Sequence, residues 1–91
     1  MPIEFDPAKR LATLQERGLD MADAEEVFAG PSLTIEDSRR DYGEKRMITI
    51  GLLFGRMVVL VWTPRGRNWR VISMRKANAR EKKLYGPRLE T

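Results

Sequence analysis

Residues 44–76 read EKRMITIGLLFGRMVVLVWTPRGRNWRVISMRK and contain three runs rich in aliphatic and β-branched side chains. The runs are Met47–Phe54, Met57–Thr63 and Trp69–Met74, and turns that contain Gly or Pro separate them. Runs of this length between such turns are typical of consecutive antiparallel strands joined by hairpins. The sequence therefore predicts a three-stranded meander at the centre of the fold.

Two helices are predicted between the N-terminus and this meander. Asp6 can accept a hydrogen bond as the N-cap of the first helix, and Pro7 suits its first position. Gly18 is a typical C-terminal cap, because glycine adopts a left-handed backbone without strain. Asp20 can cap a second helix, whose apolar residues recur at helical spacing as far as Gly30. Both helices are expected to pack on the sheet.

Shorter segments complete the predicted architecture. Ile3–Phe5 and Leu33–Ile35 have the composition of short strands. Asn78 and Glu81 form a variant of the capping box, which predicts a short C-terminal helix that ends before Gly86-Pro87. The chain is short enough for one core, so the sequence predicts a single α+β domain over all 91 residues, with an antiparallel sheet.

The last strand of the meander carries polar and apolar residues on both of its predicted faces. Strict alternation assigns Trp69, Val71, Ser73 and Arg75 to one face and Arg70, Ile72 and Met74 to the other. Because each set contains an arginine as well as apolar residues, the pattern leaves open which face the helices cover.

Charge is unevenly distributed along the chain. Residues 1–43 hold five Lys or Arg against ten Asp or Glu, a charge of −5, whereas residues 44–91 hold twelve against three, a charge of +9. The formal net charge of +4 thus conceals a basic half, which is typical of proteins that contact nucleic acid. The alternative is that the acidic helices pair with the basic rim of the sheet.

The chain contains neither cysteine nor histidine, which excludes several kinds of site. Disulfides, thiolate metal sites and the usual zinc sites cannot form, and no histidine is available as a general acid or base. We therefore expect no metal and no cofactor. The longest apolar stretch, Met57–Trp62, is too short to span a bilayer, and the N-terminus lacks the basic start of a signal peptide. A soluble cytoplasmic protein without membrane contact is expected.

Arginine side chains of the meander form the candidate functional site. Arg46, Arg70 and Arg75 can converge at the end of a small sheet, where guanidinium groups suit the geometry of phosphate. Ser73 can donate a further hydrogen bond, and Glu44 is the one acidic residue of the meander, available as an ion-pair partner or a base. An ordinary surface role is the alternative for each residue alone. Their combination with the charge pattern favours a site for RNA phosphates.

Two further features of the sequence remain open to more than one interpretation. Trp62 and Trp69 flank the arginine-rich turn, where they can stack on RNA bases or pack as large core residues. The pattern favours the core for Trp62 and leaves Trp69 undecided. The polar loop over residues 36–43 is expected to be flexible and solvated, although its Arg39 and Arg40 can reach a ligand.

Four groups of residues occur in an order that is typical of one known family. They are Phe5-Asp6-Pro7-Ala8-Lys9; Gly18-Leu19 with Ala24 and Val27-Phe28; Glu44-x-Arg46 with Ile50-Gly51; and Arg70-Val71-Ile72-Ser73-Met74-Arg75-Lys76-Ala77 with Glu81 and Tyr85. Together they cover nearly the whole chain and resemble the BrnT family of type II toxin–antitoxin systems. The last group is the most specific of the four.

This resemblance implies a RelE-like fold and a metal-independent endoribonuclease that arrests growth by cutting RNA. It also implies neutralisation by a cognate BrnA-type antitoxin, with operator DNA bound only through the antitoxin complex. In such ribonucleases the ribose 2′-hydroxyl attacks the adjacent phosphate while cationic side chains stabilise the developing charge. The motif positions expected to be catalytic are Glu44, Arg46, Arg70, Ser73 and Arg75. The residues expected to bind RNA are Arg17, Arg65, Arg67, Trp69, Lys76 and Arg80.

The chain departs from the family pattern near the end of the first predicted helix. Family members usually read Lys-His-Gly there, whereas this chain has Glu16-Arg17-Gly18, and Thr13 replaces the usual Asn. The change removes a group that titrates near neutral pH. Either that histidine is not catalytic, or Arg17 stabilises charge in its place, or the activity is weakened. The alternative function is therefore a non-catalytic RNA- or protein-binding module, a decayed toxin.

Overall fold

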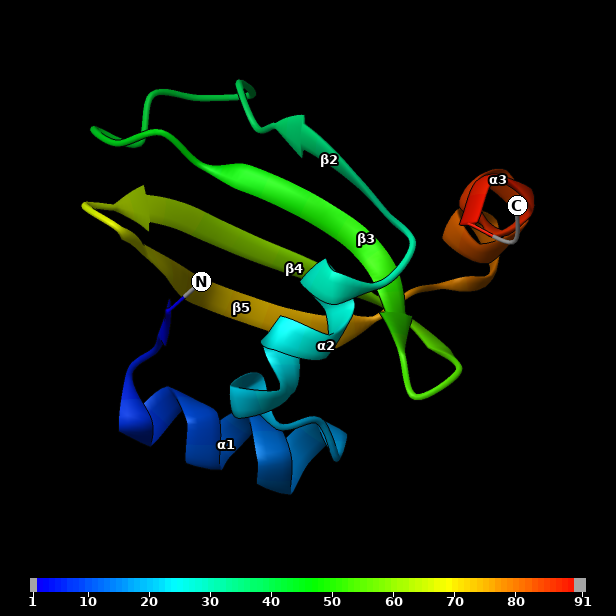
Figure 1. The fold of residues 1–91 in the computed structure, drawn as a ribbon, viewed down its shortest axis with the longest axis horizontal. Coiled ribbons are helices and arrows are strands. Elements are labelled where there is room, and N and C mark those ends of the chain that lie inside the picture. The colour runs from blue at the N-terminus through cyan, green and yellow to red at the C-terminus, as the bar shows by residue number, and fades with distance from the viewer. Residues whose placement is uncertain (1, 90–91) are drawn as a thin grey trace.

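A computed structural model describes residues 2–89 as a five-stranded sheet flanked by helices (Figure 1). In chain order the elements are β1 (Ile3–Glu4), α1 (Pro7–Arg17), the 3-10 turn η1 (Met21–Asp23), α2 (Ala24–Ala29), β2 (Ser32–Glu36), β3 (Met47–Leu53), β4 (Arg56–Arg65), β5 (Asn68–Lys76) and α3 (Ala79–Leu89). The predicted α+β class and the meander β3–β4–β5 are confirmed. Within the described part of the chain, no helix is long and apolar enough to cross a membrane.

The sheet is mixed rather than entirely antiparallel. Its strand order is β1-β5-β4-β3-β2, in which β1 pairs with β5 in parallel and every other pair is antiparallel. The antiparallel prediction is therefore right for the meander and wrong for the N-terminal edge strand. The reason is topological: after β1 the chain crosses one side of the sheet through α1 and α2 and adds β2 at the opposite edge, so no hairpin joins β1 to β5 (Figure 1).

Two tight turns set the register of the meander. Phe54 and Gly55 join β3 to β4 with φ angles of 49° and 85°, the type I′ pattern favoured in two-residue hairpins. Gly66, with φ of 60°, opens an equally short turn between β4 and β5. The five-residue turn predicted there is too long, because β4 continues through Pro64 and Arg65. Pro64 is tolerated because β4 extends beyond the end of β3 here and pairs with β5 alone, so Pro64 lies at an edge of the sheet.

The sheet buries a separate apolar cluster on each face. On the helix-covered face, α1, η1 and α2 pack against a cluster made of Leu19, Met21, Ala24, Val27, Leu53, Val58, Leu60, Trp62, Val71 and Met74. On the other face, which we call the open face, α3 covers a smaller cluster made of Ile50, Met57, Val59, Ala77 and Leu89. Figure 1 shows α1 and α2 on one side of the sheet and α3 at its far end. The rest of the open face is accessible.

β5 contains a β-bulge. Val61 of β4 lies opposite Ser73, but the next residue, Trp62, lies opposite Val71. Ile72 is therefore an extra residue on β5 that no residue of β4 opposes. Such a bulge shifts the alternation of side chains between the two faces by one position.

The bulge overturns the predicted faces of the last strand. Val71 and Met74, three residues apart, both join the cluster of the helix-covered face. Arg70, Ser73 and Arg75 consequently share the open face, whereas strict alternation had separated Arg70 from the other two. The physical reason is that Ile72, the extra residue between Arg70 and Ser73, shifts the alternation of side chains by one position.

The N-terminal helices follow their predicted caps. The side chain of Asp6 accepts a hydrogen bond from the backbone N–H of Ala8 at 2.9 Å, and Gly18 ends α1 with φ of 69°. Asp20 likewise accepts from the backbone N–H of Ala22 at 2.9 Å. What Asp20 caps is the 3-10 turn η1, and the regular helix α2 begins only after it, so the second helix is shorter than predicted.

The C-terminal helix is longer than predicted. α3 continues through Gly86 and Pro87 to Leu89, so the prediction that Gly86-Pro87 ends it is wrong. Leu89 is only 2% exposed within the cluster of the open face. Burying a leucine contributes about 1.5–3 kcal/mol, which offsets most of the roughly 3 kcal/mol that a proline costs inside a helix.

Candidate functional site

Three of the predicted catalytic residues, Arg70, Ser73 and Arg75, lie in line on the open face of β5. The residues opposite them on β4 are Thr63, Val61 and Val59, each two positions from the next. Because a strand rises about 3.3 Å per residue, the backbone positions of the two arginines are about 13 Å apart. A single-stranded polyanion that lies along β5 can therefore contact both.

A hollow of about 360 Å³ opens on this face between the β2–β3 loop and α3. Its lining is Ile35, Arg39, Ile48, Ile50, Val59, Val61, Arg75, Glu81 and Tyr85. The strand residues give it an apolar floor, while Arg39 and Arg75 bring positive charge from opposite sides. Such a surface suits single-stranded RNA, whose unstacked bases bind apolar or aromatic side chains and whose phosphates bind arginine.

Arg75 is oriented by Glu81 at the start of α3. Nη1 and Nη2 of Arg75 donate to Oε1 and Oε2 of Glu81, both at 2.8 Å, and Nη1 also lies 3.4 Å from the carbonyl oxygen of Lys76. Glu81 Oε1 also accepts the backbone N–H of Asn78 at 2.9 Å, which completes the predicted capping box. The hydrogen bonds from Arg75 lower the pKa of Glu81 to about 2. Sequence reasoning assigned Glu81 to the cap alone.

This arrangement leaves part of the Arg75 guanidinium available. A guanidinium carries five N–H donors in a fixed plane. Among the described residues, none accepts a hydrogen bond from Nε of Arg75, which lies beside the remaining N–H of Nη2. Nη1 and Nη2 form one fork of donors, which binds Glu81, while Nε and the remaining N–H of Nη2 form a second fork. A phosphate can accept hydrogen bonds from this second fork while Glu81 stays bound to the first.

Arg70 has a looser carboxylate partner on β1. Its Nη1 lies 3.5 Å from Oε1 of Glu4, the residue directly opposite it in the parallel pair. Glu4 also accepts a short hydrogen bond from the side-chain amide of Asn68. Because the contact between Arg70 and Glu4 is long, most of the donors of Arg70 are free to bind another acceptor.

Arg46 approaches the same face from the segment before β3. It precedes Met47, which packs toward the helix-covered core, so alternation directs Arg46 to the open face. Its guanidinium lies over the ring of Tyr42, with 4.1 Å between the guanidinium carbon and the ring centroid. Glu44 lies 3.8 Å from Arg46 and 3.9 Å from Arg65. The Nε of Arg46 is buried and has no hydrogen-bond partner within the described residues.

The β2–β3 loop, predicted to be flexible, is organised around a buried carboxylate. Asp37, whose side chain is 2% exposed, accepts hydrogen bonds from Nε and Nη2 of Arg39 at 2.8 and 2.9 Å and from the hydroxyl of Tyr42 at 3.0 Å. The hydrogen bonds from Arg39 hold the pKa of Asp37 well below its usual range. Asp37 thereby fixes the ring on which Arg46 rests. Nothing in the sequence pattern distinguished Asp37 or Tyr42 from the solvated residues around them.

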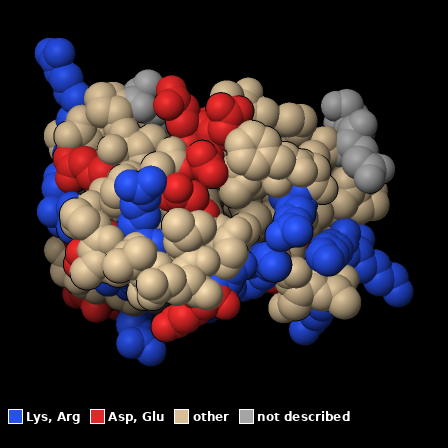
Figure 2. Space-filling model, turned by 90° about the horizontal axis from the view of Figure 1, so that it is seen from below, with Lys and Arg blue, Asp and Glu red and all other residues tan. Residues whose placement is uncertain are grey.

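The residues predicted to bind RNA are more dispersed than the catalytic ones. Arg17 lies on α1, where its Nη1 donates to the carbonyl oxygen of Met74 at 2.8 Å, and so it is not beside the open-face arginines. The other cations are exposed at the two ends of the sheet: Arg65 and Arg67 at the β4–β5 hairpin, and Lys76 and Arg80 near α3. Figure 2, seen from the side of α1, shows Lys and Arg toward both ends of the molecule, whereas Asp and Glu are seen mainly away from the end that carries α3.

Both tryptophans lie on the helix-covered face. Trp62 is 6% exposed, as predicted for a core residue, and its Nε1 donates to Oγ1 of Thr49 at 2.8 Å. The rings of Trp62 and Trp69 stack with 4.4 Å between centroids, and Phe28 packs edge-on against Trp69 at 4.7 Å. The structure therefore places Trp69, which is half-buried, against the helix-covered cluster, on the face opposite the arginines of the open face.

A family model matches most of the chain. The sequence model of the family described as "Ribonuclease toxin, BrnT, of type II toxin-antitoxin system" matches residues 5–81, which include all the arginines of the open face. The comparison with curated proteins finds no match. The matched segment runs from the residue after β1 to the first turn of α3 and so contains nearly the whole sheet. The chain belongs to the BrnT family of ribonuclease toxins of type II toxin–antitoxin systems.

Proposed function

We propose that the open face cleaves single-stranded RNA, with Arg46, Arg70 and Arg75 binding successive phosphates. The observation that carries this proposal is the bulge at Ile72, because it brings Arg70 and Arg75 to one accessible face together with Ser73. Arg75 is well placed to bind a phosphate of the strand, since Glu81 fixes its plane and leaves a fork of two donors. Fixed donors of this kind stabilise developing charge without reorganisation during the reaction.

In the proposed reaction the ribose 2′-hydroxyl attacks the adjacent phosphorus. The bond from phosphorus to the 5′ oxygen of the next nucleotide breaks, which yields a 2′,3′-cyclic phosphate and a 5′-hydroxyl end. Glu44 is the proposed base for the 2′-hydroxyl proton, and Arg46 beside it contributes positive charge. The leaving 5′ oxygen takes its proton from the solvent. Ser73, between the two arginines of β5, donates a hydrogen bond to a phosphate oxygen. The reaction as written consumes no water and requires no metal ion.

The proposed partner of the free toxin is a BrnA-type antitoxin. Membership of a type II family implies an antitoxin as well as an RNA substrate. We propose that the antitoxin neutralises the protein by binding over the open face, that free protein arrests growth, and that operator DNA is bound only through the antitoxin. Expression in a bacterium with and without that antitoxin tests this. Normal growth and intact RNA in cells that contain free protein would contradict it.

The direct test is cleavage of RNA by purified protein in the presence of EDTA. We expect cleavage to persist in EDTA, and Arg70→Ala and Arg75→Ala to lower its rate by about 10²–10³-fold each, as for the removal of a donor to developing charge. Arg75→Lys is also expected to be impaired, because an ammonium cannot replace the guanidinium fork. Lys9→Ala, an exposed cation of α1, is the control. Wild-type rates in both alanine variants would remove these arginines from the mechanism.

The second candidate is a non-catalytic module that binds RNA or protein. The observation that favours it is the absence of histidine from the chain, which leaves no side chain that titrates near neutral pH. This function predicts binding of RNA that weakens with salt, while the RNA stays intact after long incubation. End-labelled RNA incubated with the protein separates the two functions in one assay.

A further inference from the structure

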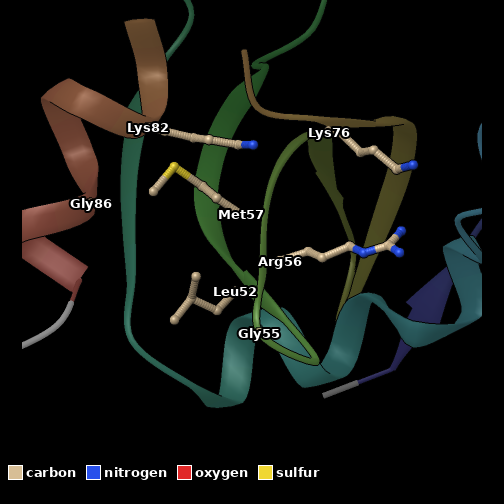
Figure 3. A pocket seen from close by; sticks show the side chains of 7 residues that line it. All are labelled: Leu52, Gly55, Arg56, Met57, Lys76, Lys82 and Gly86. Atoms are coloured by element: carbon tan, nitrogen blue, oxygen red, sulfur yellow. The ribbon is translucent and has the colours of Figure 1, made fainter. Parts of the chain in front are cut away.

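A second hollow, of about 450 Å³, lies at the end of the sheet that carries α3. The turn between β3 and β4, the end of β5 and one side of α3 surround it (Figure 3). Its lining is Leu52, Gly55, Arg56, Met57, Lys76, Lys82 and Gly86. We call it the basic pocket, because three of these residues carry a positive charge and none carries a negative one.

The chemistry of the basic pocket is that of an anion site with an apolar floor. Figure 3 shows Lys82 extending from α3 across the hollow, while Lys76 and Arg56 come from the strands. Leu52 and Met57 supply apolar surface below them. Among residues 2–89, none of the three cations takes part in an ion pair. This contrasts with Arg70 and Arg75, each of which has a carboxylate.

Uncompensated like charges around one hollow repel one another, so the arrangement gains free energy when an anion enters. Clefts lined by one sign of charge concentrate ions of the opposite sign. The side chains of Lys76, Arg56 and Lys82 are all exposed, so that a ligand can reach them without displacing the core.

The basic pocket lies next to the proposed RNA site, at the end of the sheet that carries α3. Lys76 directly follows Arg75 in the chain, but its partner Val58 belongs to the helix-covered cluster, so the two side chains leave β5 on opposite faces. Lys76 therefore borders the pocket from around the end of the sheet. α3 lies between the two hollows: Glu81 and Tyr85 line the first, whereas Lys82 and Gly86 line the basic pocket. A strand of RNA that leaves Arg75 therefore needs only to pass the first turn of α3 to reach it.

We propose that the basic pocket binds a nucleotide of the same RNA strand, next to the segment held by the open face. Arg56, Lys76 and Lys82 bind its phosphate, and the nucleoside lies against Leu52 and Met57. The proposal rests on the proposed function, because it assumes that single-stranded RNA lies along β5. It assigns a binding role to Arg56 and Lys82, which the site on the open face does not include.

The test measures binding of a fluorescent RNA in which 2′-O-methyl groups block cleavage. The variant Arg56→Gln/Lys82→Gln removes two charges of the pocket, and Lys9→Gln/Lys83→Gln removes two exposed charges outside it. We expect the pocket variant to bind about tenfold more weakly and the slope of log affinity against log salt to lessen by about 0.7, the effect of one lost phosphate contact. The control variant should change neither quantity appreciably.

A series of RNA lengths makes the test specific to the pocket. Wild-type affinity should increase stepwise once the RNA is long enough to extend from Arg75 past α3, and the pocket variant should lack this step. Equal losses in the two double variants would mean that only net charge matters and would overturn the proposal. Unchanged RNA binding with lost binding of an acidic antitoxin would also overturn it, since the pocket would then bind protein. Circular dichroism of each variant confirms that it is folded.

The two proposals fail in different ways. If the wild-type protein binds the blocked RNA with the predicted step but cleaves no unmodified RNA, cleavage is refuted and the basic pocket stands. If it cleaves RNA but the pocket variant and the control variant bind alike, the basic pocket is refuted and cleavage stands.

Discussion

Replacing Glu81 by Gln tests the contact that fixes Arg75, because it removes one charge and little else. The amide oxygen of Gln can still accept the backbone N–H of Asn78, so the cap of α3 is kept. A pKa of about 2, against an ordinary 4.5, corresponds to about 3 kcal/mol of stability at neutral pH. The Arg75 side chain is 44% exposed, so solvent screening reduces this to about 1–2 kcal/mol.

The contribution of Glu81 also has a predicted pH dependence. Its pKa is lower in the folded than in the unfolded protein, so its stabilisation is fully present above pH 4.5 and is lost as the pH falls toward 2. Urea unfolding of wild type and Glu81→Gln should therefore differ by about 1–2 kcal/mol at pH 7 and pH 5. The difference should shrink steadily between pH 4.5 and pH 2.

The matched control is Glu16→Gln, which removes an exposed carboxylate of α1 that has no ion pair among the described residues. Its free energy of unfolding should stay within about 0.5 kcal/mol of wild type at every pH. If Glu81→Gln is as stable as wild type at pH 7, or if the difference between them does not change from pH 5 to pH 2, the ion pair does not hold Arg75 in solution.

Two further substitutions test the packing of the sheet and the support of Arg46. Gly51→Ala should lower the free energy of unfolding by about 1–3 kcal/mol, because the added Cβ would lie 2.7 Å from Cγ1 of Val27. The control is Gly30→Ala, whose added Cβ would come no closer than 3.6 Å to another atom, the carbonyl oxygen of Glu26. It should change the free energy of unfolding by less than about 0.5 kcal/mol in the same urea titration. Tyr42→Leu removes the ring under Arg46 and should weaken RNA binding about two- to fivefold by fluorescence anisotropy. Tyr42→Phe keeps the ring and loses only its hydrogen bond to Asp37, so it should weaken binding less than Tyr42→Leu. Similar stability of the two glycine variants, or similar binding of the two Tyr42 variants, would contradict these contacts.

The parts of the fold that follow from local physics were predictable from the sequence. Alternating apolar runs and Gly-containing turns predicted β3, β4 and β5, and the caps at Asp6 and Gly18 predicted α1. The end of α3 was not predictable in this way. Local propensity stops a helix before Gly86-Pro87, and only the packing of Leu89 against the sheet, a contact between distant parts of the chain, carries the helix onward.

The same distinction applies to the site. The charge pattern and the motif positions identified Arg70 and Arg75, but strict alternation placed them on different faces. Glu81 was recognised as a cap, and its two hydrogen bonds to Arg75 depend on how α3 leaves β5, which no local pattern specifies. The sequence pattern left Trp69 undecided, because its packing on Trp62 and Phe28 against the helix-covered cluster again depends on distant parts of the chain.

The bulge at Ile72 lets β5 bury its apolar side chains and expose its arginines, which a regular strand of this sequence could not do. In a regular strand, Arg70 would share a face with Met74, and Val71 would share a face with Arg75. Burial of either face would therefore bring a guanidinium into the core, where an unpaired charge costs several kcal/mol. One extra residue lets both apolar side chains enter the core and both arginines leave it. The need to keep both guanidinium groups out of the core is thus sufficient on its own to account for the alignment of these arginines.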